Sequence, residues 1–338
     1  ENGIDQPFIP QREQIDGEEW ITCWGLACGY KNTGLGTGAD DTSGVTLKLL
    51  PAGRLQIKSG SSEIGQGMVT TLQLIAAEVL GIDTENINVY VMDTDLTPNG
   101  GPTTASRQTY VTGNAVREAA LLLRGRVLDL LQQHFSIDPE KVQLDARGAS
   151  AGERFFSWQQ IYDLLKNTSE GLEAGFRYHA PTTNPIEVGG RIHVAYGFSA
   201  QAVQIAIHPI SGEIRALKVV AAHDVGRVIN PLGFQGQVEG GIIMGLGHGM
   251  MEEFKVEEGV VYSDRPARYK IPRMRHLPEI VSMLVESEAA DGPFGAKGGG
   301  ELVCVPTSPA LANAVFNAIG LRVDKLPITA EKIKPHLP

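Results

Sequence analysis

The chain has 338 residues, of which 42% are hydrophobic and 20% charged, a composition typical of a folded protein with a large hydrophobic core. Its formal net charge of −10, without a run rich in lysine and arginine, argues against a nucleic-acid-binding protein and favours small molecules or proteins as partners. No apolar run reaches the length of a membrane span and no signal-peptide pattern opens the sequence, so we expect a cytoplasmic protein that does not associate with membranes.

Three cysteines occur, Cys23, Cys28 and Cys304, and no two of them form a C-x-x-C pair. This spacing predicts neither a disulfide framework nor an iron–sulfur or zinc site. Cys304 lies in an apolar run without a neighbouring histidine, which favours an inert buried thiol over a nucleophile. We expect the same of the other two cysteines.

The first predicted elements surround a loop of small residues at 59–67. Residues 45–50 and 54–58 have the pattern of a β-hairpin, and residues 68–80 have the apolar period of a helix. A strand that ends in small residues and restarts as a helix presents unpaired backbone N–H groups beside the positive end of the helix dipole, which suits an anion. A plain connection explains the loop equally well. The sequence has no G-x-x-x-x-G-K-[ST] motif, and the helix start lacks the G-x-G-x-x-G spacing.

A second helix is expected after a strand at 87–91 and a turn-rich loop at 93–102. It follows the small polar segment 103–106, and its apolar positions continue to about His134. Residues 136–190 carry many glycines and form the expected connector between two lobes.

The second half of the chain repeats the order of the first, with little residue identity. Strands are expected at 202–208 and 213–222, a polar loop at 223–234, a glycine-rich buried helix at 236–249, and a helix at 310–320. The predicted fold class is α+β, with two repeated βαβ-like lobes, mixed sheets and long amphipathic helices. We expect the first lobe at 1–135 and the second at 191–338.

Four short polar segments stand at or near predicted helix starts: 59–67, 103–108, 235–240 and 298–301. One such junction needs no special explanation. Several together predict that backbone amides and neutral side chains cradle a long anionic ligand, because small residues let the main chain approach it closely.

Eight motifs fall in the order found in one known family. They are Gly-Ser-Ser-Glu-Ile-Gly-Gln-Gly at 60–67, Asp-Thr-Asp at 93–95 with Pro98, Thr-Thr-Ala-Ser at 103–106, Gly-Asn-Ala-Val at 113–116, Asn-Pro at 230–231, Gly-Gln-Val-Glu-Gly at 236–240, Tyr-Lys-Ile-Pro at 269–272 and Lys-Gly-Gly-Gly-Glu at 297–301. Over about residues 20–330 the chain resembles the molybdenum hydroxylases, the xanthine dehydrogenase and aldehyde oxidase family, in the C-terminal half of their molybdopterin-binding region.

The resemblance implies a role for each matching residue. Cofactor contacts are implied for Ile64, Gly65, Gln66, Thr103, Thr104, Ala105, Ser106, Gln108 and Gln237, and substrate contacts for Leu35 and Gly36. Glu301 matches the glutamate that acts as general base when the family hydroxylates a heteroaromatic or aldehyde carbon with water-derived oxygen. The pterin dithiolene holds the metal in this family, so no direct protein ligand to it is implied.

Structural roles remain open for several of these positions. Glu301 could instead cap the following helix or pair with Lys297, and the segment around Leu35, where family members often have an aromatic residue, could be a flexible loop without a pocket role. Glu63 is expected to order its loop by accepting backbone N–H groups rather than to act in catalysis. His223 is expected to be a hydrogen-bonded structural histidine.

The family's other cofactor-binding half carries two further motifs, of the Gly-Gly-Gly-Phe-Gly-Gly-Lys-Glu and Ala-Phe-Arg-Gly-Phe-Gly types, and neither occurs in this sequence. The resemblance therefore implies a separate subunit or a fragment whose site is completed by a second molybdopterin-binding chain. The implied cofactor is molybdopterin in a dinucleotide form, with iron–sulfur clusters and FAD on partner chains. A non-catalytic cofactor-binding or assembly chain of the same family is the alternative, and a phosphate-cofactor enzyme unrelated to molybdenum is another.

Overall fold

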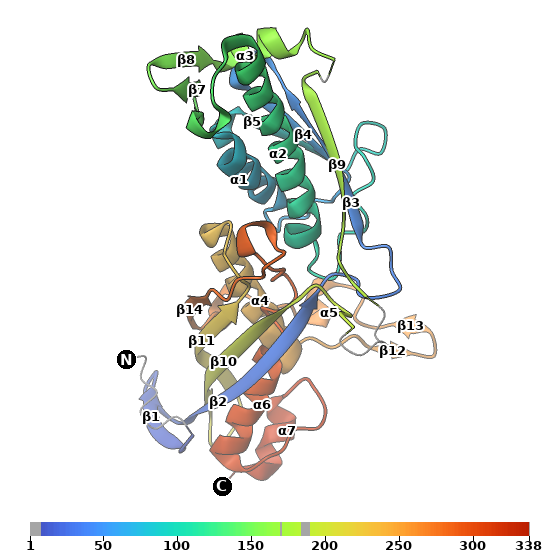
Figure 1. The fold of residues 1–338 in the computed structure, drawn as a ribbon. Helices are drawn as coiled ribbons and strands as arrows, with labels where there is room; N and C mark the ends of the chain where they lie inside the picture. The colour runs from blue at the N-terminus through green and yellow to red at the C-terminus, as the bar shows by residue number, and fades with distance from the viewer. Residues whose placement is uncertain (1–7, 170, 184–189, 338) are drawn as a thin grey trace.

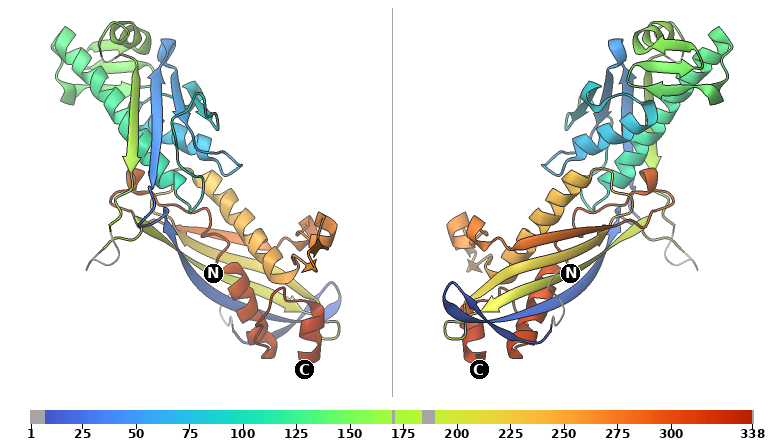
Figure 2. Two further views of the ribbon diagram at one scale, coloured as in Figure 1. Left: turned by 90° about the vertical axis from the view of Figure 1, so that its right-hand side faces the viewer. Right: turned by 90° about the vertical axis from the view of Figure 1, so that its left-hand side faces the viewer.

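The computed structural model describes residues 8–169, 171–183 and 190–337, and these residues form two lobes (Figure 1). The first lobe is built on a four-stranded sheet and the second on a five-stranded sheet. Figure 2 shows the two lobes extending in different directions from a narrow junction. The predicted site segments lie at this junction, as the contacts below establish.

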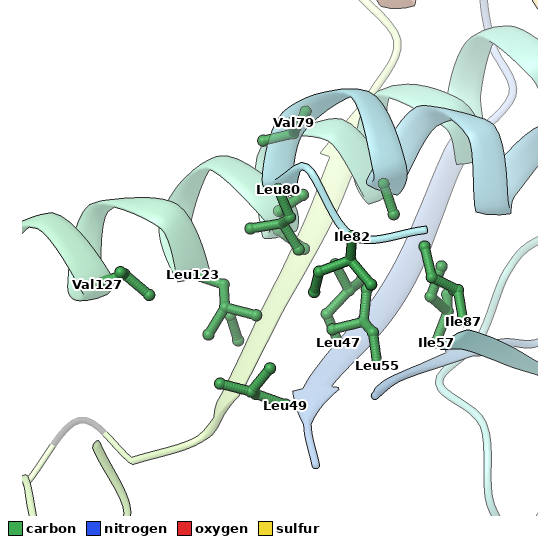
Figure 3. Packing of buried hydrophobic residues seen from close by; sticks show 14 of the residues in the cluster. Leu47, Leu49, Leu55, Ile57, Val79, Leu80, Ile82, Ile87, Leu123 and Val127 are labelled. Atoms are coloured by element: carbon green, nitrogen blue, oxygen red, sulfur yellow. The ribbon is translucent and has the colours of Figure 1, made fainter. Parts of the chain in front are cut away.

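Three short strands and two helices enclose the hydrophobic core of the first lobe. β3 (Thr42–Leu49) and β4 (Leu55–Ser59) pair antiparallel, α1 (Met68–Leu80) follows, and β5 (Ile87–Val91) pairs parallel with β4. Leu47, Leu49, Leu55 and Ile57 alternate along the strands and are fully buried with residues of α1 and of α2 (Gln108–Phe135) (Figure 3). Burial of each such side chain contributes about 1.5–3 kcal/mol, so this cluster stabilises the whole lobe.

The segment predicted as a connector packs onto the first lobe. It contains β6 (Gln143–Asp145), β7 (Gly148–Ala151), β8 (Arg154–Ser157), α3 (Trp158–Leu165) and β9 (Glu173–His179). Ser157 begins α3 with a capping box, and Trp158 on the first turn is buried in the core. β9 pairs antiparallel with β3 and gives the sheet order β5-β4-β3-β9. The expected connector is thus packed against the first lobe, and the lobe boundaries at 135 and 190 stay a prediction.

Long strands form the sheet of the second lobe, in the order β1-β2-β10-β11-β14. They are β1 (Gln11–Ile15), β2 (Glu18–Thr33), β10 (Ala195–Ile207), β11 (Ile214–Asp224) and β14 (Glu279–Val285). Helices α4 (Pro231–Met250) and α6 (Thr307–Ile319) share a buried cluster with Val203 and Val219 on one face of this sheet. Gly25 allows α6 to approach β2, because a Cβ there would lie 2.1 Å from the backbone nitrogen of Ala314.

The remaining elements are small. β12 (Val256–Glu257) and β13 (Val260–Val261) form a two-stranded hairpin, and α5 (Pro266–Tyr269) and α7 (Ala330–Ile333) are single turns. Within the described ranges, none of the helices combines the length and hydrophobicity that crossing a bilayer requires.

The mixed sheets and packed helices confirm the α+β class. Helix α1 and strand β5 have the predicted bounds, and α2 ends one residue after His134. The sequence predicts no strand before residue 45, and this is wrong, because β2 pairs with β10 across the second sheet. Such a pairing depends on a partner far along the chain, which local patterns do not reveal.

Candidate functional site

Three predicted segments meet where the lobes join. Ser106 Oγ donates to Glu301 Oε2 at 2.8 Å and accepts from the Glu301 backbone N–H at 3.1 Å. The backbone N–H of Gly34 donates to the Ala105 carbonyl at 3.1 Å, and that of Gly298 donates to Thr33 Oγ1 at 3.0 Å. The Glu301 turn, the Ser106 segment and the end of β2 therefore form one connected site.

The loop at 59–67 is ordered from within by Glu63. Its carboxylate accepts the backbone N–H groups of Gly65 at 2.9 Å, Gly67 at 3.1 Å and Val69 at 2.9 Å. Partial burial raises the pKa of Glu63, but these hydrogen bonds outweigh it and lower the pKa below its ordinary value. The expected structural role of Glu63 is confirmed. The idea that these three N–H groups are left unpaired for an anion is wrong, because Glu63 already satisfies them.

Gln66 holds the tip of the same loop. Its amide nitrogen donates to the Ser62 carbonyl at 2.8 Å, and its amide oxygen accepts from the Ile64 N–H at 2.7 Å. Ile64 is 78% exposed at the tip and Gly65 is exposed beside it, with φ +99°. The loop thus presents Ile64 and Gly65 to the outside and keeps Gln66 in a fixed position.

Thr103 and Gln108 connect this loop to the start of α2. Thr103 Oγ1 accepts from the Ser62 N–H at 2.8 Å and from Gln108 Nε2 at 3.0 Å, and Gln108 Oε1 accepts from Ser61 Oγ at 2.8 Å. Thr104 is exposed, and its carbonyl accepts from the Arg107 N–H at 3.2 Å. The two predicted cofactor segments are therefore one hydrogen-bonded unit.

Ala105 and Ser106 both have left-handed backbone conformations, with φ +52° and +50°. Non-glycine residues rarely adopt this region, and such strain persists only where the surroundings impose it. Gly298 packs directly on this turn, because a Cβ there would lie 1.6 Å from the Ser106 carbonyl oxygen. The turn and Gly298 together place the Ser106 hydroxyl against Glu301.

A buried ion pair that sequence reasoning missed supports the strained turn. Arg107 Nε lies 2.6 Å from Asp41 Oδ1, and the two side chains are 0% and 1% exposed. Arg107 also donates to the carbonyls of Thr42, Gly100 and Pro102. Asp41 Oδ2 accepts from the Leu35 N–H at 2.7 Å. The sequence does not link these two residues, because they are 66 positions apart and no local pattern connects them.

The Glu301 carboxylate is oriented by both lobes and remains accessible. It lies in the turn before α6, its Oε2 is 3.0 Å from Lys31 Nζ, and its side chain is 50% exposed. Lys297 instead pairs with Asp224 at 2.9 Å, and α6 begins only at Thr307. Neither alternative structural role considered for Glu301, pairing with Lys297 or capping the helix, is therefore what the structure contains. Sequence reasoning missed Lys31, because its partner lies at the other end of the chain.

Gln66 and Gln237 line one small cavity of about 110 Å³. Gln237 lies on the second turn of α4, which Asn230 caps by accepting the Gly233 N–H at 3.0 Å. The other polar side chains of the cavity are Thr71, Thr109, Arg227, Asn230 and Lys297. Amide and hydroxyl groups with the Arg227 guanidinium, beside a Lys297 that Asp224 already pairs, fit an anionic group rich in hydrogen-bond acceptors. Ligand pockets are usually about 300–1,000 Å³, so this cavity fits only part of a large cofactor.

Leu35 and Gly36 lie beside the cofactor segments. Gly36 is buried with φ +89°, and a Cβ there would lie 2.5 Å from the His193 ring. Leu35 is half-buried, and its neighbour Gly34 is hydrogen-bonded to Ala105. Their role toward a substrate stays a prediction.

His223 is fully buried next to Gln201, at 3.3 Å between the two Nε2 atoms, and burial lowers its pKa to about 4. This fits the expected structural histidine. Burial raises the pKa of the Cys23 and Cys304 thiols, but Cys304 is only half-buried and Cys28 is exposed, so the expectation that all three are buried holds for Cys23 alone. The described part of the chain contains no group of three or more His, Cys, Asp or Glu residues placed to hold a metal ion.

Comparison with known proteins assigns residues 9–278 to the molybdopterin cofactor-binding domain. The 6-hydroxypseudooxynicotine dehydrogenase complex subunit gamma of Paenarthrobacter nicotinovorans is 32% identical over 91% of this chain and 39% of its own length. The aldehyde oxidoreductase molybdenum-binding subunit PaoC of Escherichia coli O157:H7 is 29% identical over 99% of this chain and 44% of its own length.

The fold is similar to that of the Cu,Mo-CO dehydrogenase, with a TM-score of 0.82 and 24% identity over 94% of this chain and 41% of that one. The chain spans about two fifths of the length of the curated relatives it matches. The matched domain and these relatives agree with the ordered motifs of the sequence. The chain belongs to the molybdopterin cofactor-binding domain family of the molybdenum hydroxylases, with xanthine dehydrogenase and aldehyde oxidoreductase subunits among its relatives.

Proposed function

We propose that this chain forms one wall of a molybdopterin site in a molybdenum hydroxylase, with Glu301 as the general base. One observation carries the proposal: the accessible Glu301 carboxylate is hydrogen-bonded to Ser106, in the segment that is joined to the Gln66 loop. The Glu301 carboxylate, the Leu35 segment and a polar cavity lie together at one junction, which supports the proposal.

The cavity side chains would hold the cofactor. Gln66 and Gln237 would donate and accept hydrogen bonds with the pterin, and Arg227 would attract its phosphate, whereas the charge of Lys297 is paired with Asp224. When bound, the cofactor would supply the two-electron oxidation of the substrate carbon. Glu301 would accept the proton of the water-derived oxygen at Oε1, because Ser106 and Lys31 contact Oε2 and would keep the carboxylate in place.

The substrate, the partners and the location belong to the same proposal. A heteroaromatic or aldehyde carbon would be hydroxylated against a wall formed by Leu35 and Gly36. A second molybdopterin-binding chain or domain would complete the site, the cofactor would be a dinucleotide form, and iron–sulfur and FAD subunits would remove the electrons. The names of the relatives, a complex subunit and a molybdenum-binding subunit, support a multi-subunit enzyme. Its proposed location is the cytoplasm.

The two lobes are also proposed to carry one repeated unit. In the first lobe, the hairpin of β3 and β4 is followed by helix α1, by strand β5, which pairs parallel with β4, and by helix α2. In the second lobe, the hairpin of β10 and β11 is followed by helix α4, by strand β14, which pairs parallel with β11, and by helix α6. The equal order of elements supports this proposal.

The test is elemental analysis and turnover of the complex that co-purifies with the tagged chain. We expect bound molybdenum, and we expect Glu301→Gln to keep the metal and to lose about 10²–10⁴-fold in turnover of a purine or an aldehyde. A complex without molybdenum would exclude the function. Unchanged turnover of Glu301→Gln with the metal bound would exclude the base and favour a non-catalytic chain.

A further inference from the structure

The second sheet has an open face made of six apolar side chains. Two come from each of three strands: Leu26 and Tyr30 from β2, Tyr196 and Phe198 from β10, and Met283 and Val285 from β14. They are between 36% and 69% exposed. The register places them on one face, because Tyr30 stands opposite Phe198, Phe198 opposite Asp224, and Asp224 opposite Val285. We call these six residues the open face.

The other face of this sheet is already covered. Val203, Ile205, Val219 and Ala221 alternate with the open-face positions and are fully buried with residues of α4 and α6. The sheet therefore uses one face for the core of its own lobe. Soluble proteins seldom expose a contiguous apolar surface without a partner for it, and exposed aromatic residues are frequent at the centres of interfaces.

Charges at the two ends of the open face are paired within the chain. Lys218 lies 3.0 Å from Glu279 at one end, and Lys297 lies 2.9 Å from Asp224 at the other. Tyr30 contacts both Tyr196 and Phe198, with ring centroids 6.1 Å and 6.4 Å apart. The surface between the paired charges thus favours an apolar protein partner over a nucleic acid or an anionic membrane.

The open face continues into the proposed cofactor site. Lys297 Nζ lies 5.9 Å from the centroid of the Phe198 ring, and Lys297 also lines the cavity of Gln66 and Gln237. In the opposite direction the exposed surface ends at Trp24 and Val220, which are only 5% and 6% exposed. A partner seated on the open face would therefore reach the edge of the cavity.

We infer that the open face is the docking surface for the second molybdopterin-binding polypeptide, the one that completes the site. This inference rests on the proposed function. The occupant is the region of the relatives that this chain does not match, which makes up more than half of their length. In those relatives the matched and unmatched regions share one polypeptide, so the unmatched region is available as a permanent partner, and a permanent interface is typically apolar.

Cys28 provides a native probe of this surface. It lies between Leu26 and Tyr30 on the same face of β2, and its thiol is free and exposed. We would measure alkylation of Cys28 by N-ethylmaleimide, read out by mass spectrometry, in the native complex and in the purified chain. We expect Cys28 to react roughly tenfold more slowly in the complex. A Leu122→Cys variant on α2, at a position 46% exposed, is the control and should react equally in both.

Two matched substitutions test the same surface by affinity. Leu26→Glu on the open face and Leu122→Glu on α2 alter positions that are 45% and 46% exposed. We expect Leu26→Glu to weaken co-purification of the second chain by about tenfold or more and Leu122→Glu to leave it unchanged.

If the chain alone does not fold, the alkylation rates of Cys28 and of the Leu122→Cys thiol are compared within the complex, where only Cys28 should be protected.

Several outcomes would overturn the inference. The first is that Cys28 reacts equally fast in the complex and in the purified chain. The others are that Cys28 is protected by raising the concentration of this chain alone, by anionic lipid vesicles, or by a protein that lacks the other molybdopterin-binding region. The molybdenum content separates this inference from the proposed function. A molybdenum-containing complex with a reactive Cys28 contradicts only the docking surface, whereas a protected Cys28 in a complex without molybdenum contradicts only the function.

Discussion

Lys31 at the end of β2 and Glu301 in the turn before α6 form an ion pair, with Nζ 3.0 Å from Oε2. Ser106 donates to the same oxygen from the first lobe. The carboxylate is therefore held by a strand of the second sheet and by a strained turn of the first lobe, although its own side chain is half exposed. Its position depends on the junction as a whole and not on its immediate sequence neighbours.

Replacement of Lys31 by methionine should lower kcat of the complex while KM and molybdenum content stay nearly constant. The pair is partly exposed and such pairs contribute at most about 1 kcal/mol, so we expect a loss of less than about tenfold, smaller than that of Glu301→Gln. Lys48→Met, which removes a 3.8 Å pair with Glu173 on the first sheet, is the control in the same steady-state assay. A change in KM alone would show that Lys31 binds substrate and does not position Glu301.

Gly298→Ala should disrupt the site through a steric clash alone. A Cβ at this position would lie 1.6 Å from the Ser106 carbonyl oxygen, so the backbone must move and the Ser106 contact with Glu301 is lost. We expect turnover to fall by at least about tenfold, because small displacements of catalytic groups are costly. Gly125→Ala on α2, where a Cβ meets nothing within 4 Å, is the control. A fully active Gly298→Ala complex would contradict the packing described for this turn.

Local patterns were sufficient to predict some elements. The bounds of the helix Met68–Leu80 and of the strand Ile87–Val91 agree with the prediction, because local periodicity defines both and Gly67 and Gly81 flank the helix. Glu63 was assigned correctly for the same reason, since its partners lie within six residues. The same contacts explain why the anion prediction for this loop was wrong in part.

Pairing between distant segments could not be predicted. Strand β2 joins β10, Lys31 meets Glu301, and Asp41 meets Arg107 only after the chain has folded. Ordered motifs nevertheless suggested that the segments at 59–67, 103–108 and 297–301 belong together, and the contacts of Thr103 and Ser106 agree with this. The motifs carried information about the site that periodicity did not contain.

The buried pair of Asp41 and Arg107 should be essential for stability. Asp41→Ala leaves the Arg107 guanidinium buried without its countercharge, and breaking such a pair typically costs about 3–5 kcal/mol. We expect a large decrease in the urea midpoint of unfolding, followed by circular dichroism. Glu173→Ala, which removes an exposed pair with Lys48, should change the midpoint little. Equal effects of the two substitutions would show that the buried pair contributes no more than a surface pair.

Glu63 should make stability depend on pH in the acidic range. Its pKa is lower in the folded protein than the ordinary value of 4.5, so its stabilising contribution is complete above that value and is lost as the pH falls through the folded pKa. Glu63→Gln imitates the protonated form. The variant should therefore be less stable at pH 7 by about 0.5–2 kcal/mol, the usual contribution of a helix cap, and the difference from the natural chain should shrink as the pH falls from 4.5 through the lower folded pKa.

Thermal unfolding of both proteins between pH 3 and 7 measures this difference. Glu78→Gln, at an exposed position of α1, the helix that follows the loop, serves as the control and should leave the pH dependence unchanged. A difference between Glu63→Gln and the natural chain that stays constant down to pH 3 would mean that the charge of Glu63 does not stabilise the loop. Because the Glu63 carboxylate occupies the N–H groups of Gly65, Gly67 and Val69, such a result would also reopen these groups as cofactor contacts.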